Sequence, residues 1–241
     1  DSLIERGAVV QEQVANVEAC YLRRLWEAEC SACIRLAGLL AADTDCSAQA
    51  GRAVDELEAQ QGITYAPLQR QAGELAARTG VLVLTGGPGT GKTTTVRGIV
   101  ALFRRMGLEI VLAAPTGRAA KRMSELTGME AQTVHRMLGM SWNDVTHQVT
   151  FQKTEKEPLE ADAVIVDEMS MVDLALFSAL LRALRPGTRL VLVGDADQLP
   201  SVGAGNVFSD LIRSGRVETV FLREVFRQAE QSAIIRNAHA V

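Results

Sequence analysis

The residues with the clearest chemical potential form the run 86–93, Gly-Gly-Pro-Gly-Thr-Gly-Lys-Thr, which matches the phosphate-binding loop pattern G-x-x-x-x-G-K-[ST]. The apolar run 81–84 precedes this loop and a helical pattern begins near Lys92, which gives the strand–loop–helix context that the motif requires. Glycines let successive backbone N–H groups surround phosphates, and the helix N-terminus adds partial positive charge. We therefore expect a nucleoside triphosphate to bind here, with a chance glycine-rich turn as the alternative.

Two side chains of this loop have specific expected roles. Lys92 is expected to reach the β- and γ-phosphates, and the Thr93 hydroxyl is expected to bind Mg²⁺. The expected nucleotide contacts of the loop and its helix are Gly87, Pro88, Gly89, Thr90, Gly91, Lys92, Thr93 and Thr94.

A pair of carboxylates, Asp167 and Glu168, follows the apolar run 163–166. An acid in the position of Asp167 holds Mg²⁺ in enzymes with a phosphate-binding loop. Glu168 is placed to orient and deprotonate an attacking water. The pair alone is a weak signal, but about eighty residues downstream of such a loop it predicts hydrolysis rather than binding alone.

A third strand pattern, 191–193, ends in the polar segment Gly194–Pro200. Gln198 in this segment is a candidate to contact the γ-phosphate and to sense its presence. The alternative is an ordinary strand-to-turn connection with an Asp cap.

The elements that must position these residues alternate between strands and helices. We expect strands at 81–84, 110–113, 163–166, 189–193 and 217–222, and helices near 92–105, 118–126, 172–184 and 204–212. This alternation predicts an α/β fold with a parallel sheet and helices on both faces. Ligands bind such sheets at the carboxyl ends of the strands, which is where each of the motifs lies.

The first part of the chain has a different pattern. Apolar residues at helical spacing predict a helix over about 9–40, a turn at 43–47 and a second helix over 51–61. We therefore expect a small all-helical segment at 1–62 and an ATPase motor domain at 63–241. The segment 139–158 has no helical period and predicts a hairpin-like insertion in that domain.

Composition limits the class of protein less sharply. The chain has 241 residues and a net charge of −4, which argues only weakly against nucleic acid, because residues 97–122 contain six basic side chains and one acidic side chain. Such a stripe can follow a phosphate backbone, or can be a solvated helix face. Cys20, Cys30, Cys33 and Cys46 are expected to be free thiols, with an iron–sulfur cluster as the alternative. No membrane-spanning run or signal peptide is visible, so a cytoplasmic protein is expected.

Several motifs in order resemble those of the superfamily-one helicases, and among them the RecD-like bacterial DNA helicases, which include the alpha subunit of exodeoxyribonuclease V and stand-alone relatives. The resemblance covers about 65–241, and the segment 21–29 also resembles the stand-alone relatives. It is carried by Gly86–Thr94, Ala114–Ala120, Thr133–Arg136, Val166–Met171, Gly194–Pro200 and Val225–Gln228.

The resemblance implies roles for two further residues near the nucleotide. Gln69 resembles the glutamine that reads adenine, which implies ATP, although Gln71 is a nearby rival and a surface glutamine is the plain alternative. Arg227 resembles the arginine that contacts the γ-phosphate across the cleft, with a salt-bridge partner as the alternative.

It also implies a path for single-stranded DNA. Strand-gripping roles fall on Pro115, Thr116 and Arg118, and on His135 and Arg136, although His135 can instead cap or pack a short helix. The insertion falls where relatives carry a β-hairpin that separates the duplex. There, Trp142 or Phe151 would stack on a base, or would instead anchor the hairpin.

The resemblance implies ATP-driven, Mg²⁺-dependent 5′→3′ translocation on single-stranded DNA, with unwinding of the duplex at a junction. It places this activity in DNA repair or recombination. The implied partners are single-stranded DNA, the duplex junction and the subunits of a recombination complex. Relatives carry further motifs on a second motor domain beyond Val241, so the chain is expected to be part of a longer protein. The rival hypotheses are a superfamily-one RNA or RNA–DNA helicase, a ring-forming ATPase that remodels proteins, and a non-enzymatic scaffold with a degenerate site.

Overall fold

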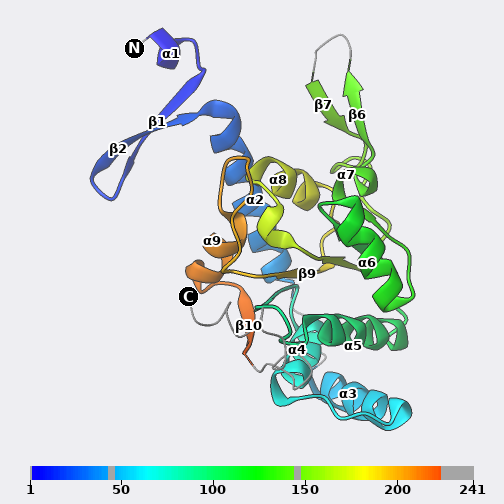
Figure 1. The fold of residues 1–241 in the computed structure, drawn as a ribbon. Helices are drawn as coiled ribbons and strands as arrows, with labels where there is room; N and C mark the ends of the chain where they lie inside the picture. Colours follow the sequence, from blue (N-terminus) through cyan, green and yellow to red (C-terminus); the bar gives the residue numbers. More distant parts are fainter. Residues whose placement is uncertain (1, 43–46, 144–147, 224–241) are drawn as a thin grey trace.

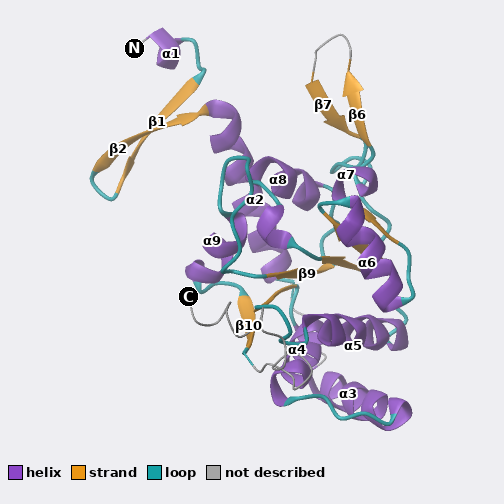
Figure 2. Ribbon diagram, viewed as in Figure 1, coloured by secondary structure: helices purple, strands orange, loops and turns teal. Residues whose placement is uncertain are grey.

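Six parallel strands form the centre of this computed structural model, which describes residues 2–42, 47–143 and 148–223 (Figures 1 and 2). Their spatial order is β10-β3-β9-β8-β4-β5, and every neighbouring pair is parallel. Their bounds are β3 Val81–Gly86, β4 Ile110–Ala114, β5 Ala131–Thr133, β8 Ala163–Val166, β9 Arg189–Gly194 and β10 Glu218–Leu222. The predicted α/β class with a parallel sheet is confirmed.

The central strands are buried on both faces, which explains why they are continuous apolar runs rather than alternating ones. In β3, Val81 and Val83 point into one hydrophobic cluster while Leu82 and Leu84 point into the other. Strands β8 and β9 divide their side chains between the same two clusters. The period of two in a strand thus builds one core on each face of the sheet.

Different helices cover the two faces of the sheet. The cluster containing Leu82 is completed by α4 (Pro67–Arg78), α5 (Lys92–Arg105) and α6 (Gly117–Thr127). The cluster containing Val81 is completed by α2 (Arg23–Leu40), α7 (Val134–Met137), α8 (Leu174–Arg182) and α9 (Val207–Ser214). Helix α3 (Ser47–Gln61) packs outside α4 and α5 in a third, smaller cluster. The strands whose carboxyl ends carry the motifs are therefore packed between two layers of helices.

The predicted helix over 9–40 is wrong in its first part, and so is the expectation of an all-helical N-terminal segment. After the short α1 (Ser2–Glu5), strands β1 (Val9–Val14) and β2 (Val17–Leu22) form an antiparallel hairpin, and α2 begins only at Arg23. Ala15 and Asn16 connect the strands with φ of 47° and 66°, which matches the two-residue turn that suits a twisted hairpin. The helical spacing gave a wrong prediction here because Val, Tyr and Cys also occur readily in strands, and Ala-Asn is not a strong turn signal.

Helix α2 packs against α8, and its Ala32 and Leu39 belong to the same hydrophobic cluster as β3 and β8. The second predicted helix is α3, which begins at Ser47 rather than residue 51. The division of the chain into two domains at residue 62 stays a prediction.

The other predicted strands and helices lie within a few residues of those observed, whereas α4, β5 and α7 were not predicted. The insertion is a β-hairpin, as predicted, with β6 (Met140–Asn143) antiparallel to β7 (Gln148–Phe151). It stands out from the body of the molecule beside α7 and α8 (Figure 1). Within the described residues, no helix combines the length and the apolar character that crossing a membrane requires.

Candidate functional site

The phosphate-binding loop connects β3 to α5 at the carboxyl edge of the sheet. Gly91, the residue before α5, has a φ of 83°, a left-handed conformation that only glycine adopts without strain. The Thr90 hydroxyl donates to the Gly87 carbonyl at 2.9 Å. The Lys92 ammonium donates to the carbonyls of Gly86 and Gly87, to the latter at 3.1 Å. The loop is thus closed around the lysine side chain.

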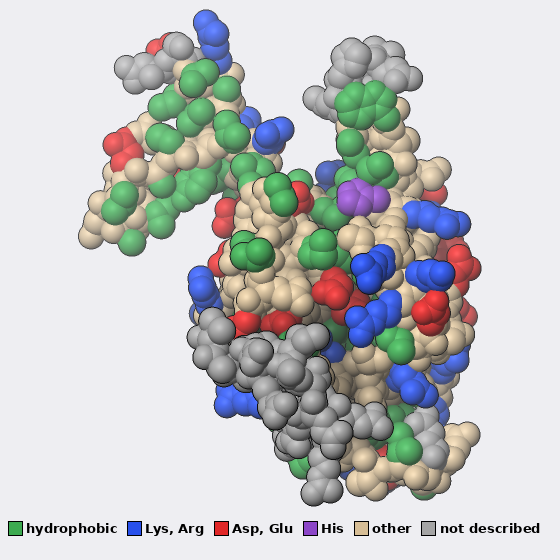
Figure 3. Space-filling view, viewed as in Figure 1, with side chains coloured by type: hydrophobic (Ala, Val, Ile, Leu, Met, Phe, Trp, Pro, Cys, Tyr) green, Lys and Arg blue, Asp and Glu red, His purple; other side chains and the backbone are tan. Residues whose placement is uncertain are grey.

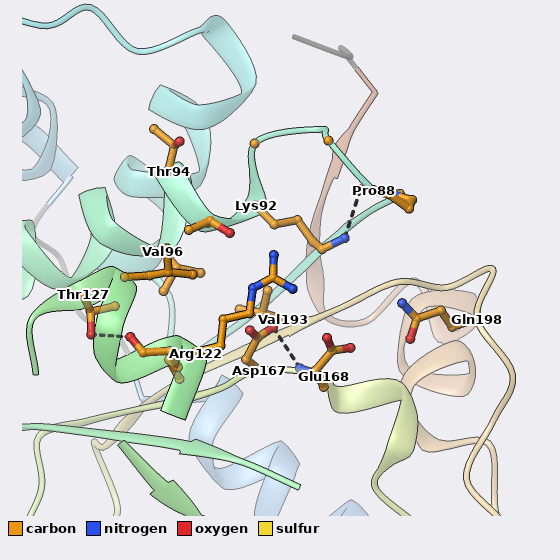
Figure 4. A pocket seen from close by; sticks show the side chains of 16 residues that line it. Pro88, Lys92, Thr94, Val96, Arg122, Thr127, Asp167, Glu168, Val193 and Gln198 are labelled. Atoms are coloured by element: carbon orange, nitrogen blue, oxygen red, sulfur yellow. Dashed lines mark hydrogen bonds between the residues drawn. The ribbon is translucent and has the colours of Figure 1, made fainter. Parts of the chain in front are cut away.

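A pocket of about 500 Å³ lies against this loop and is formed by residues from several strand ends (Figure 4). Asp167 and Glu168 reach it from the end of β8, and Gln198 reaches it from the turn after β9. The loop and α5 contribute Gly87, Pro88, Gly89, Gly91, Lys92, Thr93 and Thr94. The tertiary structure therefore brings together residues as far apart in the sequence as Gly87 and Gln198.

Asp167 is held by the sheet itself. Its N–H donates to the Ala113 carbonyl at 2.9 Å, and one carboxylate oxygen accepts the Glu168 N–H at 2.8 Å. Burial raises the pKa of Asp167, against the opposing effect of that hydrogen bond and of the Lys92 and Arg122 charges. The second carboxylate oxygen remains available to a cation in the pocket.

Glu168 has a left-handed backbone, with φ 54° and ψ 41°, which is unfavourable for a residue with a Cβ. Such strain persists only where the surrounding structure imposes it, and it is concentrated at functional sites. Burial raises the pKa of the Glu168 carboxyl, and the neighbouring Asp167 charge raises it further. A raised pKa makes this carboxylate a better proton acceptor near neutral pH.

The pKa of Lys92 is likewise set by two opposing effects, burial and neighbouring charge. Burial lowers its pKa, while the carboxylates of Asp195, Asp167 and Glu168 raise it. Asp195 is itself buried at the end of β9 and accepts the Asp197 N–H at 3.1 Å. A single partly desolvated lysine thus faces three carboxylates, a field that favours binding of a cation together with phosphates.

The 3-10 turn η1 (Met169–Met171) follows Glu168 in the sequence and is hydrogen-bonded to the turn that carries Gln198. The Ser170 hydroxyl donates to the Gln198 side-chain oxygen at 3.3 Å. The base of that turn is fixed to β3, because the Ala196 N–H donates to the Thr85 hydroxyl at 3.2 Å. The orientation of Gln198 is therefore set from two directions.

Two predicted nucleotide ligands do not line the pocket. Gln69 is buried at the start of α4, where its side-chain oxygen accepts the Ala66 N–H at 3.2 Å and its side chain faces a small cavity beside Tyr65. The Thr90 side chain is also buried and serves the loop itself. In both cases the hydrogen-bonding atom satisfies the protein's own backbone, which the sequence pattern did not reveal.

One wall of the pocket was missed by sequence reasoning. Helix α6 contributes Arg122, Met123, Leu126 and Thr127, which lie on one face of the helix. Arg122 belongs to the basic stripe over 97–122, which by sequence alone indicates contact with a phosphate backbone or a solvated helix face and does not point to the nucleotide pocket.

A second hollow of about 800 Å³ lies between the β6–β7 hairpin and the N-terminal ends of α6 and α8. Four of the predicted DNA-binding residues line it, namely Pro115, Thr116, His135 and Trp142, whereas Arg118 and Arg136 do not. Arg24, Val149, Phe151, Met171, Asp173, Ala175 and Leu176 complete the lining. In the space-filling view, basic side chains gather below the single histidine on this face, over the region of α6 (Figure 3).

The geometry assigns different positions to the two aromatics of the hairpin. The Phe151 ring lies 6.4 Å from the His135 ring, centroid to centroid, and packs against the main core. The Trp142 side chain is 58% exposed. The Thr116 hydroxyl caps α6 by accepting the Ala119 N–H at 3.2 Å, so it also has a structural role.

Two kinds of predicted residue remain to be placed, namely Arg227 and the four cysteines. Arg227 and Cys46 lie outside the described residues. Cys20, Cys30 and Cys33 are free thiols, and burial raises the pKa of Cys33. Across the part of the chain that the structure describes, no group of three or more His, Cys, Asp or Glu side chains is arranged to hold a metal.

The chain is similar in sequence and in structure to several known proteins. Residues 69–204 match the family described as the AAA domain. The chain is 46% identical over 161 residues to the ATP-dependent RecD2 DNA helicase of Deinococcus radiodurans, covering 67% of this chain and 21% of that protein. It is 40% identical over 215 residues to the RecBCD enzyme subunit RecD of Mycolicibacterium smegmatis, covering 80% of this chain and 37% of that protein.

Among solved structures, the Pif1 helicase from Candida albicans matches with a TM-score of 0.52 and 26% identity, over 72% of this chain and 43% of that chain. The chain thus spans between about a fifth and two fifths of the length of these relatives.

Proposed function

Because this chain belongs to the AAA-domain family and is similar to the RecD2 and RecD proteins described above, we propose that it is the first motor domain of an ATP-dependent DNA helicase. The observation that carries the proposal is the single pocket shared by Lys92, Thr93, Asp167, Glu168 and Gln198. These are the residue types that hold, polarise and hydrolyse a nucleoside triphosphate. A scaffold with a degenerate site would not need all five in one place.

In this proposal Lys92 and the loop N–H groups bind the phosphates, and Glu168 accepts a proton from the attacking water. The half-buried position of Glu168 and its raised pKa support that role. Gln198, held by Ser170, senses the γ-phosphate. Arg227 is proposed to contact the same phosphate when the second motor domain closes, and Gln69 is retained as a candidate for the adenine contact only if its amide leaves the Ala66 N–H.

The donor set at this site fits Mg²⁺. Thr93 and Asp167 offer a hydroxyl and a carboxylate, and Mg²⁺ is commonly held by one or two such oxygens with phosphates and waters rather than by a complete protein cage. When bound, Mg²⁺ would neutralise charge on the phosphate oxygens.

Single-stranded DNA is proposed to lie in the hollow lined by Pro115, Thr116, His135 and Trp142. The short path Glu168–Met169–Ser170–Met171 connects the two sites, because Glu168 lines the nucleotide pocket and Met171 lines the hollow. Hydrolysis would move this turn and so change the grip on the strand. Binding of this kind is independent of base sequence and sensitive to salt.

The finer parts of the proposal rest on the resemblance of the motifs to those of RecD-like helicases. They are 5′→3′ translocation, separation of the strands at a duplex junction, a role in DNA repair or recombination, and action in the cytoplasm. One relative is a subunit of the RecBCD enzyme, which supports association with recombination subunits.

The experiment that tests the proposal is the ATPase rate of the full-length protein, with and without single-stranded DNA, beside a Glu168→Gln variant. Strong stimulation by DNA that disappears in the variant is the expected result. Single-stranded RNA is included in parallel, because equal or better stimulation by RNA would favour an RNA or RNA–DNA helicase. Hydrolysis that is indifferent to DNA, RNA and the substitution would overturn the helicase proposal.

A further inference from the structure

Arg122 lies in the wall of the nucleotide pocket, and its direction is fixed by the register of α6. Ala120 and Met123 are buried, which seats the helix on the sheet. The Thr127 hydroxyl donates to the Met123 carbonyl at 2.7 Å. The residues that line the pocket from α6 are 122, 123, 126 and 127, a spacing that defines one helix face. Arg122 is therefore turned toward the pocket by the packing of its own helix.

The Arg122 guanidinium lies between the Lys92 side chain and the carboxylates of Asp167 and Glu168 (Figure 4). It is close enough to all three to alter their electrostatics. Among the described residues that line the pocket, Lys92 and Arg122 are the two with a positive charge. None of the salt bridges formed within residues 2–42, 47–143 and 148–223 includes Arg122.

We propose that Arg122 is a second phosphate-binding residue of this pocket, which contacts the γ-phosphate of the bound nucleoside triphosphate from the α6 wall. This inference rests on the proposed ATPase function and adds a ligand that comes from the same domain. The γ end is assigned because Asp167 and Glu168, which act at that end, are the groups that Arg122 faces.

The chemistry of the side chain suits this position. A guanidinium carries a permanent charge and up to five donors in a rigid fork, so it binds two phosphate oxygens at once. A phosphate-bound arginine also offsets the negative charge that develops during hydrolysis. A structural ion pair would instead require a carboxylate partner in contact with Arg122.

Contact with DNA is the alternative for a basic residue on α6. The hollow assigned to DNA is lined by Thr116 at the N-terminal end of this helix, and Arg122 does not line it. Six residues further along the helix, Arg122 lines the nucleotide pocket. The basic stripe of the sequence is thus divided by the fold, and Arg122 lies on the nucleotide side.

The test measures nucleotide affinity rather than turnover. Equilibrium binding of ADP and of a non-hydrolysable ATP analogue, each with Mg²⁺, is compared in full-length wild-type, Arg122→Gln and Arg122→Lys proteins. Arg213→Gln on α9 is the matched control, because it removes an exposed arginine charge that is not part of the pocket lining. Thermal unfolding of each variant confirms that it is folded.

We expect Arg122→Gln to weaken binding of the ATP analogue about tenfold or more, the effect of losing a charged hydrogen bond, and to weaken ADP binding by less than about twofold. Arg122→Lys should recover part of the loss, since it keeps the charge without the fork. Arg213→Gln should bind both nucleotides as the wild type does.

Equal affinities of wild type and Arg122→Gln for the analogue would overturn the inference, and so would an equal loss for ADP and the analogue. A fall in turnover at unchanged affinity would also overturn it, because Arg122 would then act on the carboxylates and not on phosphate. Failure of the proposed function is distinguishable, since the wild type itself would then bind neither nucleotide.

Discussion

The hydroxyl of Ser170 donates a hydrogen bond to the side-chain oxygen of Gln198 at 3.3 Å, across 28 positions of sequence. Ser170 lies in the turn between the carboxylates of Asp167 and Glu168 and the hollow proposed for DNA, and it is buried. Gln198 lines the nucleotide pocket. One neutral hydrogen bond therefore joins the proposed phosphate sensor to the turn that leads to the second site.

Removing this hydrogen bond should weaken the coupling between DNA binding and ATP hydrolysis more than it weakens the binding of ATP. A neutral hydrogen bond contributes about 1 kcal/mol, so Ser170→Ala is expected to lower DNA-stimulated kcat by about fivefold. The KM for ATP should change little, because Lys92 and the loop are intact. Steady-state ATPase assays with single-stranded DNA measure both constants. Ser214→Ala on α9 is the control, and an unchanged kcat in Ser170→Ala would refute the role.

The left-handed backbone of Glu168 predicts a conflict between stability and activity. This conformation costs a residue with a Cβ about 1 kcal/mol, a cost that glycine avoids. Glu168→Gly should therefore raise the free energy of unfolding by about 1 kcal/mol while abolishing hydrolysis. Urea denaturation alongside the ATPase assay tests both effects. Glu168→Gln should lose activity equally but gain less stability, and equal stability of the two variants would exclude backbone strain as the cause.

The two aromatic residues of the β6–β7 hairpin, Trp142 and Phe151, should have different roles, one in unwinding and the other in stability. Trp142 is mostly exposed, so Trp142→Ala should change stability by less than about 0.5 kcal/mol and yet impair unwinding of forked DNA. Phe151 packs on the core, so Phe151→Ala should cost about 2 kcal/mol. Both variants are assayed for unwinding, for DNA-stimulated ATPase and by urea denaturation. Normal unwinding by Trp142→Ala would contradict a wedge role for this side chain.

A carboxylate away from the pocket should give a measurable pH dependence of stability. Glu155 accepts hydrogen bonds from Arg182 of α8 at 2.8 and 3.2 Å and pairs with Arg35 of α2 at 3.0 Å. Chiefly through Arg182, the pKa of Glu155 is lowered to about 2 from its ordinary value of 4.5. Because the folded-state pKa is depressed, the stabilisation is fully present above pH 4.5 and is lost as the pH falls toward 2.

Glu155→Gln should therefore lower the free energy of unfolding at pH 7 by about 1 kcal/mol, a value limited by solvent screening of the partly exposed pair. The difference from wild type should shrink below pH 4.5. Urea denaturation at several pH values measures it. Glu157→Gln is the control, since its i,i+4 contact with Lys153 is exposed and should contribute less than about 0.5 kcal/mol. A difference that persists unchanged into acid would contradict the assignment.

The strand–loop–helix segment of 81–105 could be predicted because its signals are contiguous. A run buried on both faces, a glycine loop and a lysine at the helix start specify their own local structure. The same holds for Asp167 and Glu168, whose position follows from the end of a buried strand. By contrast, 9–22 has Val, Tyr and Cys side chains compatible with either helix or strand, and only the backbone at Ala15 and Asn16 decided the outcome.

Two functional assignments depended on side-chain direction, which spacing does not determine. Gln69 turned out to face its own helix start, and Arg122 turned out to face the pocket. In each case the orientation follows from the way a helix packs on the sheet, through contacts with residues far away in sequence.

The sequence by itself determined the chemistry: a phosphate-binding loop, two carboxylates and a glutamine, each at a strand end, since each motif is a short stretch with its own propensities. Only the tertiary structure decided which of these residues share one pocket, which aromatic anchors the hairpin and which basic residue serves the nucleotide. The physical reason is that a parallel sheet gathers strand ends from distant positions, and helix packing then fixes the direction of each side chain.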